Sequence, residues 1–302
     1  MKKVILSVFL LFIGFSSIHS QPRILQDAAK RAADAAGIDS AQVDRAVTGV
    51  ASFADSVKAA DNLTPENEYY LGRAVAAKIA GTYKIYRDPA LETYLNKICQ
   101  TIVISSPRPD IYNGYHVAIL DTDEINAFAT PGGHIFVTRG LIACAGNEDA
   151  LAAVIAHEIA HIQLRHALTS IRNARYVNAA VSGALAGAGG AGGNVKELAG
   201  IMGDSVNEVI TTMVVNGFSP AQEFEADTTA LSLLAAAGYQ PAGLLEMLEV
   251  LKQKQGNNKT AGFGKTHPSP AERITKVKKN IGKYKVPDTR NYRTKRFNDI
   301  RR

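Results

Sequence analysis

The segment that begins at the predicted helix cap Asn147 and carries apolar residues from Leu151 to Ile162 also holds two histidines four positions apart, and no other segment constrains the fold as much. His157 and His161 lie on one face of the predicted helix, because residues four apart in an α-helix share a face. The flanking residues are alanine, valine and isoleucine, so both imidazoles are expected to be half-buried. A buried imidazole needs a polar partner, and one metal ion can bind two such rings at about 2.0–2.1 Å. The segment therefore predicts a globular domain built around a metal-binding helix.

Glu158 lies between the two histidines in sequence, and its presence indicates that the metal would be catalytic. The pattern His-Glu-Ile-Ala-His at 157–161 is typical of metal hydrolases, in which the glutamate takes a proton from a metal-bound water. One alternative is an amphipathic helix that carries two histidines without a metal. Another is a structural zinc domain. In such a site cysteine or histidine normally occupies all four coordination positions of the zinc, and Glu158 would have no role.

A candidate third ligand lies in the segment Glu-Phe-Glu-Ala-Asp at 223–227, which is also predicted to be helical. Glu223 and Asp227 share one face, and Glu225 is expected to point elsewhere. Glu223 can complete a site of two histidines and one glutamate that leaves the fourth position for water. Asp227 can accept the outer N–H of a ligand histidine and so fix its tautomer. The alternative is a solvated acidic helix face.

A third histidine ligand is excluded by the residues that follow His161. The extended pattern His-Glu-x-x-His-x-x-Gly-x-x-His needs glycine at 164 and histidine at 167, where this chain has Leu164 and Ala167. His166 lies nine residues after His157, which is about 180° round a continuous helix. His166 is therefore expected to stay outside the site.

The remaining pattern predicts an α+β fold, mainly helical, with a small antiparallel sheet. Helices are expected from Thr64-Pro65 to Gly81, and after Asp88-Pro89. Strands are expected at 116–120, 126–130 and 134–138, with a tight turn at Pro131-Gly-Gly between the last two. The alanine- and glycine-rich run 179–193 is predicted to be either a lid over the cleft or a tolerated linker.

The chain divides into four predicted parts. Residues 1–20 have the basic, apolar and small-residue order of a secretory signal, with cleavage after Ser20; the alternative is an uncleaved membrane anchor. Residues 21–60 form a helical segment, 61–287 the catalytic domain and 288–302 a basic tail. Cys99 and Cys144 are expected to be small buried hydrophobic residues, and export permits a disulfide between them.

Charge is distributed unevenly along the chain. The formal net charge is +6, yet residues 275–302 hold 11 Lys and Arg against two Asp, so the rest of the chain is net acidic. An acidic body argues against binding to nucleic acid. The tail is predicted either to be solvated or to contact an anionic membrane surface, with Tyr284, Tyr292 and Phe297 as anchors.

Five motifs together resemble one known family. They are Asn126-Ala-Phe-Ala129, the run Pro131-Gly-Gly-His-Ile-Phe-Val-Thr-Arg-Gly-Leu141, the segments 157–161 and 223–227, and His-Pro-Ser-Pro-Ala-Glu-Arg at 267–273. In this order they resemble metallopeptidase family 48, which includes HtpX-like heat-shock proteases, CAAX prenyl endopeptidases and periplasmic proteases of the BepA and LoiP type. The resemblance covers roughly residues 64–285. Two departures are expected: no multiple membrane spans, and no tetratricopeptide domain after Arg302.

The resemblance implies a zincin fold of the gluzincin type with one Zn²⁺ per chain. The implied residues are the zinc ligands His157, His161 and Glu223, the general base Glu158, and the substrate-binding residues Asn126, Ala127, Phe128 and Ala129 on an edge strand. His267 is implied either to stabilise the transition-state oxyanion or to sit on the zinc as a plug in a resting state. Arg273 would support the end of the site where His267 lies.

The function that follows is a zinc metalloendopeptidase of the bacterial cell envelope. The expected location is the periplasm, either free or peripheral at the outer membrane, and the expected substrates are unfolded or misassembled proteins. The alternative is a latent protease that acts mainly as a chaperone or assembly factor for envelope proteins.

Overall fold

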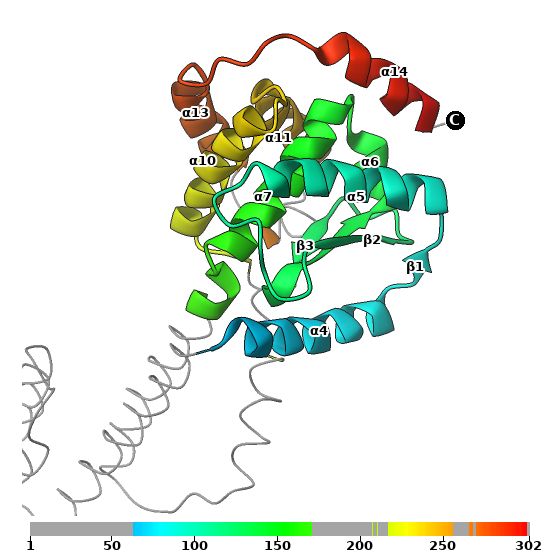
Figure 1. Cartoon of the computed structure of the whole chain (residues 1–302). Coiled ribbons are helices and arrows are strands. Elements are labelled where there is room, and N and C mark those ends of the chain that lie inside the picture. Colours follow the sequence, from blue (N-terminus) through cyan, green and yellow to red (C-terminus); the bar gives the residue numbers. More distant parts are fainter. Residues whose placement is uncertain are drawn as a thin grey trace, which may run out of the picture. The chain divides into compact units, whose positions relative to one another are not determined.

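The structure is a computed structural model that describes residues 63–170, 207, 210, 217–255, 266–267 and 270–300 (Figure 1). These residues all belong to one compact unit formed by residues 60–174 and 193–302. The predicted signal 1–20, the segment 21–60 and the alanine- and glycine-rich run 179–193 lie outside the described residues.

The described residues of this unit form eight helices and four strands, together with a one-turn 3₁₀ helix. The helices are α4 (Pro65–Thr82), α5 (Pro89–Ile104), α6 (Arg139–Cys144), α7 (Glu148–Gln163), α10 (Pro220–Ala236), α11 (Ala242–Gln255), α13 (Pro270–Ile281) and α14 (Arg290–Ile300). The strands are β1 (Ile85–Tyr86), β2 (His116–Leu120), β3 (Ala127–Ala129) and β4 (His134–Thr138), and the 3₁₀ helix is η1 (Pro131–Gly133).

Polar side chains cap the first turn of the four longest described helices, α4, α5, α7 and α10. The Thr64 side chain accepts a hydrogen bond from the backbone N–H of Asn67, and Asp88 does the same at the start of α5, each followed by proline. Asn147 caps α7, and Ser219 begins α10 with a reciprocal capping box. Such caps satisfy backbone donors that the helix itself leaves without partners. The predicted helix starts are confirmed.

The sheet is mixed, which corrects the prediction of a purely antiparallel one. Its strand order is β1-β2-β4-β3. β3 and β4 form the predicted antiparallel pair across the turn, but β2 pairs with β4 in parallel, with His116 opposite His134. The chain crosses from β2 to the far side of β4 before it makes the hairpin, so β3 becomes the edge strand. The two-residue strand β1 was too short to predict.

Alternate side chains of the strands enter two separate cores. Leu120, Phe128 and Phe136 pack with apolar residues of α4 on one face. Val117, Ala127, Val137 and their neighbours pack with α5 and α7 on the other. Figure 1 shows α4 below the sheet and α5 and α7 above it. Period-two alternation in the strands therefore places the sheet between two helical layers.

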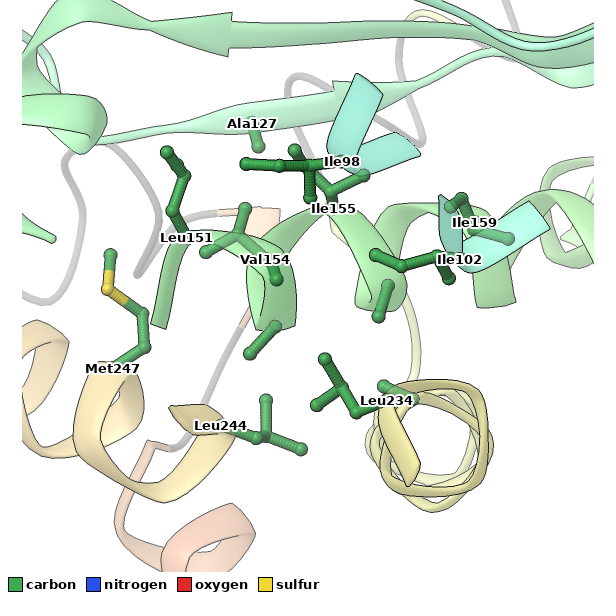
Figure 2. Packing of buried hydrophobic residues seen from close by; sticks show 14 of the residues in the cluster. Ile98, Ile102, Ala127, Leu151, Val154, Ile155, Ile159, Leu234, Leu244 and Met247 are labelled. Carbon is green, nitrogen blue, oxygen red and sulfur yellow. The ribbon is translucent and has the colours of Figure 1, made fainter. Parts of the chain in front are cut away.

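The helix α7 is enclosed on every side. Figure 2 shows its residues Leu151, Val154 and Ile155 between Ala127 of the sheet and the helices that follow in the chain. Leu234 of α10 and Leu244 of α11 close the other side of the same cluster. All but one of its 16 residues are buried, the exception being the terminal Gln163. The histidines are thus fully buried at 2% exposure each, more than the half-burial expected from the sequence.

The turn between β3 and β4 is fixed by close contact with α4. Gly132 has φ 71°, and a Cβ there would lie 2.4 Å from the Cα of Tyr69. A Cβ on Gly72 would lie 1.6 Å from the carbonyl oxygen of Pro131. Only glycine permits the positive φ and the approach of helix to turn at these positions.

Helix α14 packs on the body of the protein, and one predicted membrane anchor is wrong. Phe297 is only 1% exposed, so it cannot contact lipid. Arg296 pairs with Glu148, and Arg293 lies 3.0 Å from Asp149, so basic residues of the tail neutralise buried acids of the body. The positive charge of the tail is therefore partly neutralised by ion pairs with acidic residues of α7. Membrane contact stays a prediction for Tyr292, which is 79% exposed.

Two further expectations concern membranes and disulfides. Among the described residues, no helix is both long and apolar enough to cross a bilayer. Cys99 is buried and Cys144 is half-buried, and neither is in a disulfide. Burial raises the pKa of the Cys99 thiol to about 12, which suits a packed and unreactive side chain.

Candidate metal centre

Four side chains from three segments converge on one buried point. Helix α7 supplies two histidines, α10 supplies a glutamate, and the segment before α13 supplies a third histidine. One nitrogen or oxygen atom from each lies within 4.8 Å of the others, in the set His157, His161, Glu223 and His267. All four are buried, as the solvent exposure of each is 2% or less. The structure therefore brings together the three predicted ligands and adds His267 to them.

The separations among these atoms match a set arranged around one ion. The Nε2 atoms of His157 and His161 are 3.0 Å apart. The Glu223 carboxylate lies 3.6 Å from the first of these nitrogens and 3.5 Å from the second. Ligands about 2 Å from a tetrahedral metal are separated by distances of this order.

The outer nitrogen of His157 is held by Asp227, as predicted. The Nδ1 atom of His157 is 3.1 Å from Oδ1 of Asp227, a distance at which the ring N–H donates to the carboxylate. Nη2 of Arg273 lies 3.4 Å from the same nitrogen but makes its shorter contact, 2.6 Å, with Asp227. A proton on Nδ1 leaves Nε2 directed at the shared point.

The carboxylates of the cluster favour positive charge on His157, whereas burial holds the pKa of His161 well below its usual range. Burial and the Arg273 charge lower the pKa of His157, but Asp227 and Glu223 outweigh them and raise that pKa to about 9. Burial raises the pKa of Glu223, yet the charges of His267 and Arg273 hold it well below its usual range. A cation is therefore favoured between these ligand atoms, and two imidazoles with one carboxylate are a donor set that zinc accepts. The residues fit the metal.

Glu158 lies beside this cluster without a close partner. It is 1% exposed, and within the described residues neither carboxylate oxygen has a hydrogen-bond partner. Nε2 of His267 lies 3.7 Å from Oε1 of Glu158. Burial raises the pKa of Glu158, although charges on His267 and His157 oppose the shift. A buried carboxylate of raised pKa is suited to accept a proton and release it again.

Arg273 is held more tightly in the site than the sequence indicated. It is 1% exposed, and its Nε and Nη2 atoms lie 2.8 and 2.6 Å from the two Asp227 oxygens. Its Nη1 atom is 2.9 Å from Oε2 of Glu223. Although burial raises the pKa of Asp227, Arg273 outweighs it and lowers that pKa to about 2. Arg273 thus keeps two buried carboxylates ionised and in place.

The structure places His166 next to the ligand cluster, although neither His166 nor Glu225 belongs to that cluster among the described residues. His166 was expected on the far side of a continuous helix, but α7 ends at Gln163 and Arg165 adopts φ 55°. The chain turns back, and Nδ1 of His166 lies 2.8 Å from Nδ1 of His161. Glu225 is 3.3 Å from the other nitrogen of His166. Leucine and arginine both favour helix, so Leu164 and Arg165 gave no sign in the sequence that α7 ends there.

The predicted substrate strand lies next to the site. Ala129, at the end of β3, and His161 line one small pocket together with Phe218. Asn126, Ala127, Phe128 and Ala129 are all buried, at 4% exposure or less. Oδ1 of Asn126 accepts a hydrogen bond from Thr266, the residue before His267. The structure thus links the edge strand to the His267 segment, and substrate binding by this strand stays a prediction.

The sequence profile of peptidase family M48 matches residues 89–281, which is more than half of the chain. The chain belongs to peptidase family M48. Both α7, with its two histidines, and α10, with Glu223 and Asp227, lie within the matched M48 region. The region that matches the family model therefore contains the whole ligand cluster. M48 peptidases use a metal, and the cluster around His157 is where this chain can hold one.

Three relatives show how far the similarity extends. The beta-barrel assembly-enhancing protease of Escherichia coli O157:H7 is 29% identical over 74% of this chain and 47% of its own length. The mitochondrial metalloendopeptidase OMA1 of Schizosaccharomyces pombe is 31% identical over 61% of this chain and 51% of its own. The metalloprotease LoiP of Escherichia coli K12 is 33% identical over 51% and 58%. The chain spans about half the length of these M48 relatives.

Proposed function

We propose that this chain is a zinc metalloendopeptidase. The observation that carries the proposal is the convergence of His157, His161 and Glu223 beside Glu158, a buried carboxylate that lacks a hydrogen-bond partner among the described residues. A zinc ion bound there would act as a Lewis acid, polarising a peptide carbonyl and making a nearby water more acidic.

The chain's own residues supply the proton transfers and the orientation. Glu158 takes a proton from the attacking water and gives it to the amine that leaves, because it is a buried carboxylate beside the cluster whose oxygens have no hydrogen-bond partner among the described residues. Asp227 holds His157 by its outer nitrogen, and Arg273 holds Asp227 and Glu223. These contacts keep the groups in place before a substrate arrives, which lowers the cost of reaching the transition state.

The edge position of β3 supports a preference for unfolded chains. A strand at the edge of a sheet can pair through its backbone with an extended segment. The end of β3 lies beside His161, so such a segment would run past the metal. Only an unfolded or exposed stretch of protein can adopt this conformation. The proposed substrates are therefore unfolded or misassembled proteins.

The location and biological role are proposed from the sequence and the relatives together. Residues 1–20 have the pattern of an export signal. Two of the relatives are named as a beta-barrel assembly-enhancing protease and a metalloprotease. An exported peptidase that cleaves unfolded proteins would serve quality control in the cell envelope.

Metal removal tests the proposed activity. Purified residues 21–302 are expected to cleave casein, to lose essentially all cleavage after dialysis against a chelator, and to regain it with one equivalent of zinc, because the carbonyl must be polarised at this cluster. Magnesium, which prefers oxygen ligands in octahedral geometry, serves as the control and should not restore cleavage. Full cleavage by the metal-free protein would refute the proposal.

The position of His267 favours a second candidate function, a protease held in a latent state. Its Nδ1 atom is 2.9 Å from Oε1 of Glu223 and 3.4 Å from Nε2 of His157. This places His267 among the ligand atoms, where it would take the fourth position of a bound zinc. A catalytic zinc keeps that position open. In this arrangement the chain would bind unfolded proteins without cutting them, as a chaperone does.

Replacing His267 with alanine separates the two roles considered for this residue. As a plug, its removal opens the fourth position, and casein cleavage should rise by about tenfold if the closed arrangement is about 90% populated. Stabilisation of an oxyanion predicts the opposite, a loss of about 10²–10³-fold in kcat. We expect the increase, measured on variants with zinc content matched to the wild type.

A further inference from the structure

A chain of polar contacts leads from the proposed ligand His161 to the surface. Its Nδ1 atom, on the side away from the ligand cluster, lies 2.8 Å from Nδ1 of His166. The Nε2 atom of His166 lies 3.3 Å from Oε2 of Glu225. His166 is 3% exposed, whereas the Glu225 side chain is 60% exposed. A buried imidazole thus joins the ligand to a carboxylate at the surface.

Only one placement of protons on the neutral rings of His161 and His166 allows both hydrogen bonds and also leaves a lone pair on Nε2 of His161, the nitrogen that would bind the metal. The carboxylate of Glu225 accepts, so Nε2 of His166 carries the proton and donates it. Nδ1 of His166 then has a lone pair and accepts from Nδ1–H of His161. With its proton on Nδ1, His161 keeps a lone pair on Nε2, the atom that faces His157. The reverse order would put a proton on Nε2 of His161 and block metal binding there.

Neighbouring residues hold both rings in these orientations. The ring of Phe218 stacks on His161 with centroids 4.1 Å apart and an interplanar angle of 18°. The amide of Gln222 donates to the backbone carbonyl of His166 at 3.2 Å. Gln222, Glu223 and Glu225 all belong to α10. One helix therefore supplies both a proposed ligand and Glu225, the last residue in the chain of contacts from His161 through His166.

We propose that His166 and Glu225 are positioning residues that fix the tautomer of His161, so that its Nε2 keeps the lone pair that binds the metal. This inference rests on the metal site proposed above. The two ligand histidines then have different hydrogen-bond partners on their outer nitrogens. His157 contacts the carboxylate of Asp227 directly, whereas His161 contacts the imidazole of His166. Partners of this kind raise metal affinity as well as activity.

Zinc affinity of purified residues 21–302 tests the inference without reference to cleavage. His166→Leu removes the acceptor and is expected to weaken zinc binding about 10–100-fold in competition with a chromophoric chelator. His166→Asn places an amide oxygen near the position of Nδ1 and should stay within about threefold of the wild type. Glu225→Ala should weaken binding by several-fold and Glu225→Gln less, since the amide oxygen still accepts.

A second measurement covers the case in which His166→Leu does not fold. Histidine ¹⁵N shifts of the zinc-free protein report the tautomer directly, and His161 should carry its proton on Nδ1 in the wild type and as a mixture in Glu225→Ala. Equal zinc affinity for wild type and His166→Leu, or equal weakening by His166→Leu and His166→Asn, would overturn the proposal that His166 and Glu225 fix the tautomer of His161. Failure of the wild type to bind zinc would instead refute the metal site itself.

Discussion

Glu158→Gln is expected to lower kcat on casein by about 10²–10⁴-fold while zinc stays bound. The amide has nearly the same shape as the carboxylate but cannot accept a proton from water. Glu158 is not among the clustered ligand atoms, so zinc content should not change. The measurement is the initial rate of cleavage by wild type and variant, each checked for one zinc per chain.

Stability provides an internal check on this variant. The Glu158 carboxylate is buried without a hydrogen-bond partner among the described residues, so a neutral amide should leave the free energy of unfolding unchanged or slightly higher. Glu249→Gln is a matched control, because Glu249 lies on α11 with a side chain that is 46% exposed. Cleavage by Glu158→Gln within tenfold of the wild type would show that another group is the base.

Arg273→Leu is expected to lower the free energy of unfolding by about 3–5 kcal/mol, the usual effect of removing one partner from a buried ionic group. The guanidinium is 1% exposed and contacts both Glu223 and Asp227. Without it, two carboxylates remain buried together and repel each other. Urea unfolding of the zinc-free proteins is the appropriate measurement, because bound zinc would mask part of the loss.

A second substitution distinguishes charge from packing in this effect. If uncompensated charge causes the loss, then adding Asp227→Asn to Arg273→Leu should recover part of the stability, since one buried charge is removed. If the loss comes from the missing bulk of the arginine, the double variant will be no better than the single one. A loss below about 1 kcal/mol for Arg273→Leu would mean that the ion pairs contribute little.

Local sequence patterns were enough to predict the starts of three long helices and to select the residues that the structure brings together, whereas α14 was expected only as a basic tail. The caps at Thr64, Asp88 and Asn147 and the spacing of apolar residues depend on neighbours in the chain, and all three helices begin as expected. His157 and His161 share a face because the helix is regular between them. Glu223 could be added because its chemistry completes a donor set that two histidines leave open.

What could not be predicted depends on contacts between distant segments or on the end of a helix. The parallel pairing of β2 with β4 follows from a crossover that leaves no local pattern. The position of His166 depends on where α7 stops, and helix ends are set by one or two residues. Phe297 looked like an exposed anchor because its partners lie far away in sequence.

The docking of α14 has a consequence for the order in which the protein matures. Glu148 and Asp149 occupy the first turn of α7 and are compensated by Arg296 and Arg293. Glu148 and Arg296 are 148 residues apart, so a growing polypeptide presents the histidine helix long before its counter-charges exist. The metal centre is therefore expected to form only after the segment that carries α14 has been synthesised and has docked. A nascent chain that still lacks α14 would not yet be able to cleave unfolded protein.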